Sequence, residues 1–348
     1  MQRVITGLVL AASLGLAGSI HAAPDPAAPD FRVVQQFTLG GSGGWDYLTM
    51  DAEANRLFIS RSDRVLVVST RDGSLLKTIP GTAGVHGIAL APDLAKGFTS
   101  NGRADTVTVF NLQTLEPTGT IAVEGHNPDA ILYDGTSGRL FTFNGASQDI
   151  SVIDPAAGRV IAHIPAGGKP EFAVADDAGR IFINIEDTAQ VLVIDARSAQ
   201  LIARWQLSHC EEPTGIALDV AHERLFSVCR NGVLTVTDTR SGKHVAEAPI
   251  GKGPDAAAFD PERGLVFSSN GQDGTLTVIH EVDPDHYASV STVATQKSAR
   301  TMALDRTHHR VFLVSAEFGP APAATAEQPR PRPPVLEGTF KVLVVAEH

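Results

Sequence analysis

Six ionisable side chains and one threonine recur along the chain at intervals of about 42 residues. These residues are Asp46, His86, Asp129, Glu171, Thr214, Asp255 and Arg300. Each lies twelve positions before a phenylalanine, except Glu171, for which the spacing is eleven. Carboxylates, an imidazole and a guanidinium are the groups that bind ions, transfer protons and orient polar ligands. If the fold brings these positions to one place, they form a polar ligand site there.

The four carboxylates of this set, Asp46, Asp129, Glu171 and Asp255, are oxygen ligands suited to Ca²⁺, Mg²⁺ or Mn²⁺. Their spacing matches no local metal loop, and Arg300 could neutralise them instead, so we assign no cofactor and keep a divalent cation as an alternative. Individually, an Asp at the start of a strand can also cap a turn. Trp45 adds aromatic surface beside Asp46, and we include it in the ligand site.

Two hydrophobic patterns repeat seven times and indicate the elements that would position these residues. The first is a phenylalanine that usually follows a basic and an apolar residue, found at Phe58, Phe98, Phe141, Phe182, Phe226, Phe267 and Phe312. The second is a β-branched run centred near Val67, Val109, Val152, Val193, Val236, Val278 and Val344, with five steps of 41 to 43 residues and one of 66. Each unit contains four short apolar runs separated by turn residues, which is typical of a β-propeller blade.

The last unit ends before a fourth strand, whereas residues 31–41 resemble the fourth strand of the other units. Pairing of this N-terminal strand with the C-terminal blade would close the ring and remove an exposed sheet edge. The sequence therefore predicts an all-β fold, a seven-bladed β-propeller with four antiparallel strands per blade, as a single domain over 31–348. The set beginning with Asp46 would then start the innermost strands and meet at one mouth of the channel, on what we call the top face.

Three segments resemble the repeat of a known family. They are Phe98-Thr99-Ser100-Asn101, Phe141-Thr142-Phe143-Asn144 and Phe267-Ser268-Ser269-Asn270. They are similar to the Tyr-Val-Thr-Asn repeat of the YVTN family of seven-bladed propellers, with Arg61 and Ser315 as departures in the first and last blades. The resemblance implies an exported propeller without an assigned reaction. We interpret the motif Asn as a turn residue.

The two cysteines, Cys210 and Cys229, lie just before one predicted inner strand and at the end of the next. Antiparallel pairing would bring them together, so we expect a disulfide that fixes Glu212 at the channel mouth as a further ligand residue. A catalytic thiol with His209 as its base is the alternative.

The N-terminus predicts export. Arg3 is the only charged residue before an apolar run from Val4 to Ile20, and the small residues Ala22 and Ala23 follow. This pattern is typical of a signal peptide (1–22) cleaved near Ala22-Ala23, followed by a short linker (23–30). An uncleaved anchor is the alternative, but we expect no membrane span in the mature chain. The predicted location is periplasmic or secreted.

Composition and missing motifs limit the function. The chain has 348 residues, is 43% hydrophobic and carries a net charge of −11, which argues against disorder and against nucleic-acid binding. It contains no nucleophile elbow, phosphate loop, dinucleotide fingerprint or Cys-x-x-Cys motif. A proline-rich segment at 319–338, between the last two strands, is either a solvated loop or a lid over the top face.

We therefore predict a monomeric exported propeller that binds a small molecule or another exported protein on its top face. The first alternative is a propeller hydrolase of the lactonase type, with a divalent metal in the channel and a carboxylate base. The second alternative is a cell-surface protein-interaction module.

Overall fold

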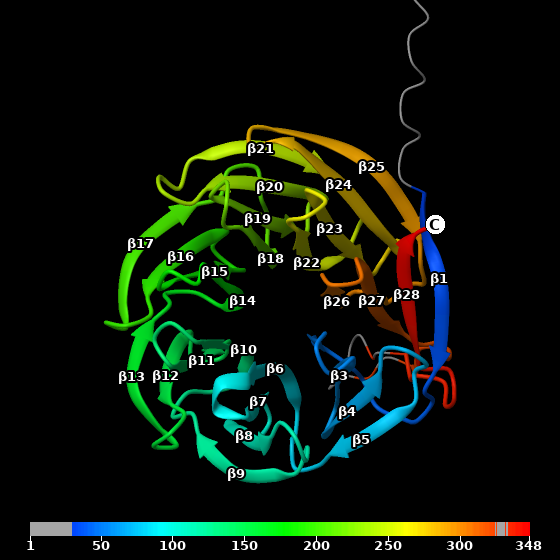
Figure 1. The fold of residues 1–348 in the computed structure, drawn as a ribbon, viewed down its shortest axis with the longest axis horizontal. Coiled ribbons are helices and arrows are strands. Elements are labelled where there is room, and N and C mark those ends of the chain that lie inside the picture. The colour runs from blue at the N-terminus through cyan, green and yellow to red at the C-terminus, as the bar shows by residue number, and fades with distance from the viewer. Residues whose placement is uncertain (1–29, 324, 326–330, 332) are drawn as a thin grey trace, which may run out of the picture.

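The computed structural model describes residues 30–323, 325, 331 and 333–348, which form a ring of seven antiparallel sheets around a central channel (Figure 1). Each sheet has four strands, and the only helical element among the described residues is the short 3-10 turn η1 (Pro92–Leu94). The predicted all-β, seven-bladed β-propeller is confirmed. The expected signal peptide (1–22) and all but the last residue of the linker (23–30) lie outside the described residues.

Six blades contain four strands that follow one another in sequence, from the channel outwards (Figure 1). The first three blades consist of β2 (Leu48–Asp51), β3 (Arg56–Arg61), β4 (Arg64–Ser69) and β5 (Leu75–Ile79); β6 (Val85–Ala91), β7 (Lys96–Asn101), β8 (Thr106–Asn111) and β9 (Pro117–Ala122); and β10 (Pro128–Asp134), β11 (Arg139–Asn144), β12 (Asp149–Asp154) and β13 (Arg159–Pro165). The next three consist of β14 (Pro170–Ala175), β15 (Arg180–Ile185), β16 (Gln190–Asp195) and β17 (Gln200–Gln206); β18 (Pro213–Asp219), β19 (Arg224–Cys229), β20 (Val233–Asp238) and β21 (His244–Pro249); and β22 (Pro254–Asp260), β23 (Leu265–Asn270), β24 (Thr275–Asp283) and β25 (His286–Ala294).

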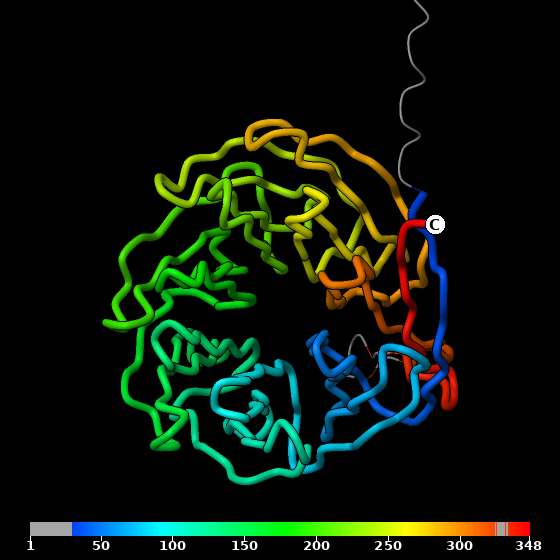
Figure 2. The backbone as a smooth tube through the Cα atoms, in the orientation of Figure 1, coloured from blue at the N-terminus to red at the C-terminus, as the bar shows by residue number. Residues whose placement is uncertain are grey.

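The seventh blade joins the two ends of the chain. Its inner strands are β26 (Met302–Asp305), β27 (Arg310–Ser315) and β28 (Lys341–Glu347), and its outer strand is β1 (Phe31–Thr38). Strand β1 pairs antiparallel with β28, from Phe31 opposite Glu347 to Thr38 opposite Lys341. In Figure 2 the trace runs once around the ring and the two ends meet side by side. The predicted closure is therefore confirmed.

The repeated phenylalanines form the cores between blades. All seven are buried, with exposed fractions of 0–2%, on the second strand of each blade. The basic residue two positions earlier links neighbouring blades, because its side chain donates to a backbone carbonyl of the next blade. Arg56, Arg139 and Arg180 donate to the carbonyls of Leu112, Ala196 and Thr239 over 2.7–3.1 Å. The repeated residues thus make contacts between blades as well as within them.

The motif asparagines join two neighbouring strands by hydrogen bonds. Our interpretation of them as turn residues was wrong. Asn101, Asn144 and Asn270 are fully buried, and each side-chain amide donates over 2.8–2.9 Å to a hydroxyl on the third strand of its blade. The glycines after Asn101 and Asn270 leave space for His86 and Arg300. A Cβ at Gly102 would lie 2.8 Å from the His86 ring.

A disulfide joins Cys210 and Cys229 in the fifth blade, as predicted, with their Cα atoms 5.3 Å apart. Within the described part of the chain, no helix is long and apolar enough to span a membrane. The proline-rich segment leaves the ring between β27 and β28, and its described base is held by a bridge between Phe318 and Val335.

Candidate ligand site at the channel mouth

The chemical groups predicted to meet do so at the top of the channel. They surround a cavity of about 450 Å³ that is lined by every blade except the fifth, whose Thr214 is not among the lining residues. The lining residues are Asp46, Tyr47, His86, Asp129, Lys169, Glu171, Phe172, Asp255, Arg300 and Thr301. The charged members are only partly exposed, with side-chain fractions between 13% for Asp129 and 38% for Arg300. Because the blades are equivalent, residues that recur with the sequence period lie at the same place in each blade, at the start of its inner strand.

Arg300, from the seventh blade, bridges the carboxylates of its two neighbouring blades. Its guanidinium donates to Asp255 on one side and, over 3.0 Å, to Asp46 on the other. It also donates to the backbone carbonyl of Trp45 over 3.0 Å. Burial alone would lower the pKa of Arg300, but the two carboxylates raise it above its ordinary value. The guanidinium is a fixed cation at this junction.

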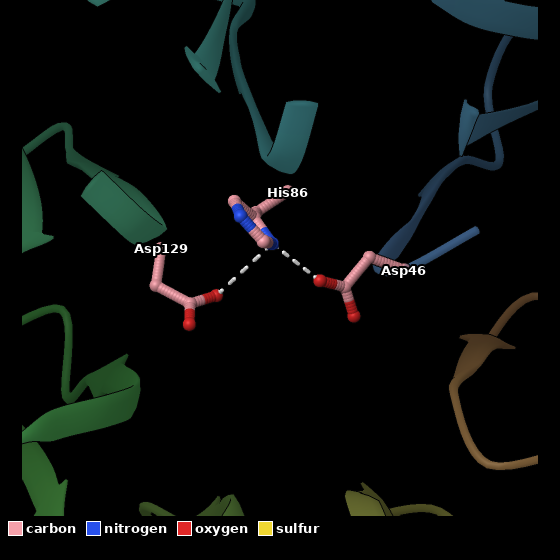
Figure 3. Close-up of side chains that lie close together, drawn as sticks. All are labelled: Asp46, His86 and Asp129. Carbon is pink, nitrogen blue, oxygen red and sulfur yellow. Dashed lines mark hydrogen bonds and ion pairs between the residues drawn. The ribbon is translucent and has the colours of Figure 1, made fainter. Parts of the chain in front are cut away.

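His86 continues the alternation of charge into the second and third blades. Its Nδ1 lies 2.6 Å from Asp46 Oδ2 and 3.7 Å from Asp129 Oδ1, and all three side chains point into the channel (Figure 3). Burial works against the charged forms, yet the hydrogen bond between them lowers the pKa of Asp46 and raises that of His86. Negative and positive groups thus alternate from Asp255 through Arg300, Asp46 and His86 to Asp129.

The remaining carboxylate, Glu171, pairs with Lys169, which does not belong to the periodic set. The Lys169 ammonium lies 3.0 Å from Glu171 Oε2 and forms a second ion pair with Glu186. One cation therefore serves two carboxylates in the fourth blade. Lys169 stands in the loop before β14, at Gly168-Lys169-Pro170, where only its basic character beside an inner strand could have indicated it.

Three carboxyl groups of the cavity have pKa values raised above the ordinary value. Burial raises the pKa of Asp129 to about 6, against the opposing charge of His86. Burial, together with the charge of Asp129, raises the pKa of Glu171 to about 8, against the charge of Lys169. Burial also raises the pKa of Asp255. The cations of the cavity therefore do not fully offset the cost of ionising these buried carboxyl groups.

An aromatic floor closes the cavity from below. Tyr47 of the first blade reaches across the channel to the fourth, where its hydroxyl donates to the Glu171 carbonyl over 3.2 Å and its ring lies 4.9 Å from that of Phe172. Burial raises the pKa of Tyr47 well above its ordinary value, so the phenol stays neutral. The cavity is therefore a cup at the top face with a defined floor.

Two predicted site residues lie outside the cup lining. The Trp45 ring faces a neighbouring cleft of about 590 Å³, where it packs against Phe318 at 5.9 Å. Glu212 forms an exposed ion pair with Arg230, and its side chain is 45% exposed. The disulfide therefore does not bring Glu212 into the cup as expected. Arg300 lines both the cup and the cleft, so the two hollows adjoin.

The first blade also contains a cation that the sequence had indicated only as a motif departure. Arg61 is fully buried and stacks on the Phe340 ring, with its guanidinium carbon 3.7 Å from the ring centre. Burial, reinforced by the charge of Arg64, lowers the pKa of Arg61 to about 10. Arg61 thus packs against the residue that precedes β28, and it does not line the cup.

A possible metal ligand set lies within the cup. Asp46, His86 and Asp129 present one ligand atom each within 4.8 Å of one another. Carboxylate and imidazole ligands suit Mn²⁺ or Zn²⁺ better than Ca²⁺. The two other carboxylates of the periodic set, Asp255 and Glu171, are already paired with Arg300 and Lys169.

Comparison with known proteins extends to the fold alone. No known family and no curated protein matches the sequence. The chain is similar to a solved chain of Kuenenia stuttgartiensis hydrazine synthase, with a TM-score of 0.69, 17% identity, and coverage of 78% of this chain and 92% of that one. It is also similar to the WD40 repeats of RRP9, with a TM-score of 0.73, 12% identity, and coverage of 92% and 99%. Both similarities support the β-propeller fold, and the second supports WD40-like repeats.

Proposed function

We propose that this protein is an exported β-propeller of the YVTN type that binds a small organic cation in the cup at its channel mouth. The observation that carries the proposal is the unequal number of charges around the cup. Four lining carboxylates, together with Glu186, which shares Lys169, face only three cationic groups, Arg300, Lys169 and the titratable His86. A bound cation would complete the charge balance without rearranging the ring.

The protonation of the cup favours the same class of ligand. With its pKa raised to about 8, Glu171 remains partly protonated near neutrality, because ionisation would leave an uncompensated buried charge. A cation that binds beside it would stabilise the carboxylate and release the proton. We therefore expect binding to strengthen as the pH rises from about 6 to about 8.

The adjoining cleft favours a cation with an apolar substituent. Trp45, Phe318 and Val335 line it, and it meets the cup at Arg300. A ligand that places an ammonium group at the carboxylates and an aromatic or aliphatic part against Trp45 would use both hollows.

The test uses simple amines as probes, measured by isothermal titration calorimetry. We expect 2-phenylethylamine to bind more tightly than ethylamine, because only the former reaches the cleft, and to bind more tightly at pH 8 than at pH 6. Both amines stay protonated over this range. Glu171→Gln should weaken binding by roughly 10- to 150-fold, the value of one charge-assisted hydrogen bond.

Two controls make the test decisive. Glu212→Gln removes an exposed carboxylate of the same face outside the cup and should leave binding unchanged. Phenylacetate, which has the same ring with the opposite charge, should not compete. Equal affinity for phenylacetate and the amine, or equal affinity of both variants, would contradict the proposal.

A metal-dependent hydrolase is the second candidate, favoured by the ligand set Asp46, His86 and Asp129. In that case the cation would be a divalent metal, and it would supply a water nucleophile of lowered pKa. Mn²⁺ would then bind with one equivalent, Asp129→Asn would abolish binding, and lactone hydrolysis would depend on the metal. Amine binding that persists in metal-free protein distinguishes the first candidate from this one.

Export is supported by the N-terminal segment and by the disulfide, because disulfides persist in oxidising compartments. N-terminal sequencing of the mature protein should begin at Ala23. A chain that retains residues 1–22 in the cytosol would contradict export while leaving the cup intact.

A further inference from the structure

A second cluster of charged groups lies at the junction of the fifth and sixth blades, at the opposite ends of the strands from the cup. Asp219 is the last residue of β18, His222 follows in the turn before β19, and Glu281 lies near the end of β24. One ligand atom of each lies within 4.8 Å of the others. We propose that these three residues form a binding site for a first-row divalent metal such as Zn²⁺.

Apart from the titratable imidazole of His222, no cation of the described residues pairs with the two buried carboxylates. Their side chains are 3% exposed, and no described donor reaches Glu281 Oε2. Arg224 carries the nearby charge, but its guanidinium pairs with Asp238 and Asp285 instead. Two adjacent buried carboxylates repel each other unless a proton or a metal lies between them.

A metal would replace the hydrogen bonds that now join the ligand atoms: His222 Nδ1 lies within hydrogen-bond distance of Asp219 Oδ2, and the Tyr287 hydroxyl donates to Glu281 Oε1 over 3.3 Å. The Ala221 N–H donates to Asp219 Oδ1 over 3.0 Å, which orients the carboxylate with Oδ2 next to His222. Asp219 Oδ2 lies 2.6 Å from His222 Nδ1, and Glu281 Oε1 lies 3.4 Å from the same nitrogen. Ligand atoms on a tetrahedral Zn²⁺ are about 3.3 Å apart, given bond lengths of about 2.0 Å. His222 is 52% exposed, so its ring can adjust by this amount and gives the metal a path of entry.

The fold does not require a carboxylate at the position of Glu281. The same backbone hydrogen bond, from this residue to the turn between the first two strands of its blade, is made by Thr70, Leu112, Ala196 and Thr239 in other blades. All four are uncharged, whereas Glu281 is acidic and faces Asp219 across a blade boundary. An imidazole with two carboxylates is a ligand set typical of Zn²⁺ or Mn²⁺ rather than of Ca²⁺.

The proposal is tested by titrating EDTA-treated, full-length protein with ZnSO₄ and measuring binding by calorimetry and the shift in melting temperature. We expect one equivalent to bind outside the cup and to raise the melting temperature. Glu281→Gln and Asp219→Asn should each weaken Zn²⁺ binding at least tenfold, with Glu281→Gln retaining the wild-type circular dichroism spectrum. If Asp219→Asn does not fold, Glu281→Gln alone decides.

Matched variants locate the metal. Asp260→Asn changes the equivalent residue of the sixth blade, which pairs with His309, and should leave Zn²⁺ affinity unchanged. Asp129→Asn in the cup should also leave this equivalent in place. Absence of Zn²⁺ binding by the wild type, or wild-type affinity in Glu281→Gln, would overturn the proposal and show that the two carboxylates share a proton.

Discussion

Replacing Arg300 with Met tests whether the alternating charges of the cup stabilise the ring. Methionine keeps much of the length of the side chain but removes the guanidinium. The change deprives Asp46, Asp255 and the Trp45 carbonyl of their shared donor. Breaking a fully buried ion pair costs about 3–5 kcal/mol. Because Arg300 is 38% exposed, we expect a smaller loss, about 2–3 kcal/mol at pH 7.5.

The pH dependence of this loss identifies its cause. In the wild type, the pKa of Asp46 is below its ordinary value, so the stability that this carboxylate contributes is present at neutral pH and is lost as the pH falls. Without the guanidinium, mutual repulsion raises the pKa values of Asp46 and Asp255, and the variant loses stability as the pH rises. The difference between the two proteins should therefore be large at pH 7.5 and below about 1 kcal/mol at pH 4.

The assay is urea unfolding of both proteins at the two pH values, followed by far-UV circular dichroism. Arg230→Met, which breaks the exposed pair with Glu212, is the control, and it should change stability by less than about 0.5 kcal/mol. A loss of the same size at pH 4 and pH 7.5 would refute the electrostatic explanation and indicate that Arg300 acts through packing.

Three further changes test the closure, the disulfide and the cup. Deleting residues 31–41 should prevent cooperative folding, and unchanged stability of this deletion variant would refute the closure. Phe31→Ala should lower the free energy of unfolding, measured with heat or urea, by about 3 kcal/mol, because Phe31 is buried against Phe267. Replacing Cys210 and Cys229 with Ser should cost about 3 kcal/mol, and mass mapping of unreduced wild-type protein should find the two peptides joined rather than two free thiols. Because burial raises the pKa of Glu171 to about 8, wild-type stability should fall as the pH rises from about 5 to 8, whereas Glu171→Gln should be about 2–4 kcal/mol more stable at pH 8.5; parallel pH profiles would contradict this.

The sequence predicted the backbone of this protein better than its side chains. A period of about 42 residues fixes the start of every inner strand, so Asp46, His86, Asp129, Asp255 and Arg300 could be assigned to one mouth. The same reasoning predicted the pairing of β1 with β28, since it asks only which strand lacks a partner. These features depend on repetition, which is visible in one sequence.

Features that depend on non-repeating segments could not be predicted. Lys169 and Glu212 stand directly before an inner strand, at a position that is Gly84, Asn127 or Gly253 in other blades, so no repeated residue type marked them. Trp45 turns into a cleft formed by the base of the proline-rich segment. The contact of Tyr47 with Phe172 depends on the radius of the channel, which only the assembled ring defines. The motif asparagines were misassigned to turns because their hydroxyl partners, such as Thr108, stand seven residues away on another strand.

The pairing of β1 with β28 also determines when the ring can form. During synthesis β1 emerges long before β28, so the outer strand of the seventh blade waits for its partner until β28 has been made. Contacts between residues so distant in sequence form slowly, because a long loop must be closed before they contribute. For the exported chain proposed above, this delay is useful, since a polypeptide that stays open while it is being made can still be threaded through a membrane pore. The ring would then close only after β28 has arrived on the far side.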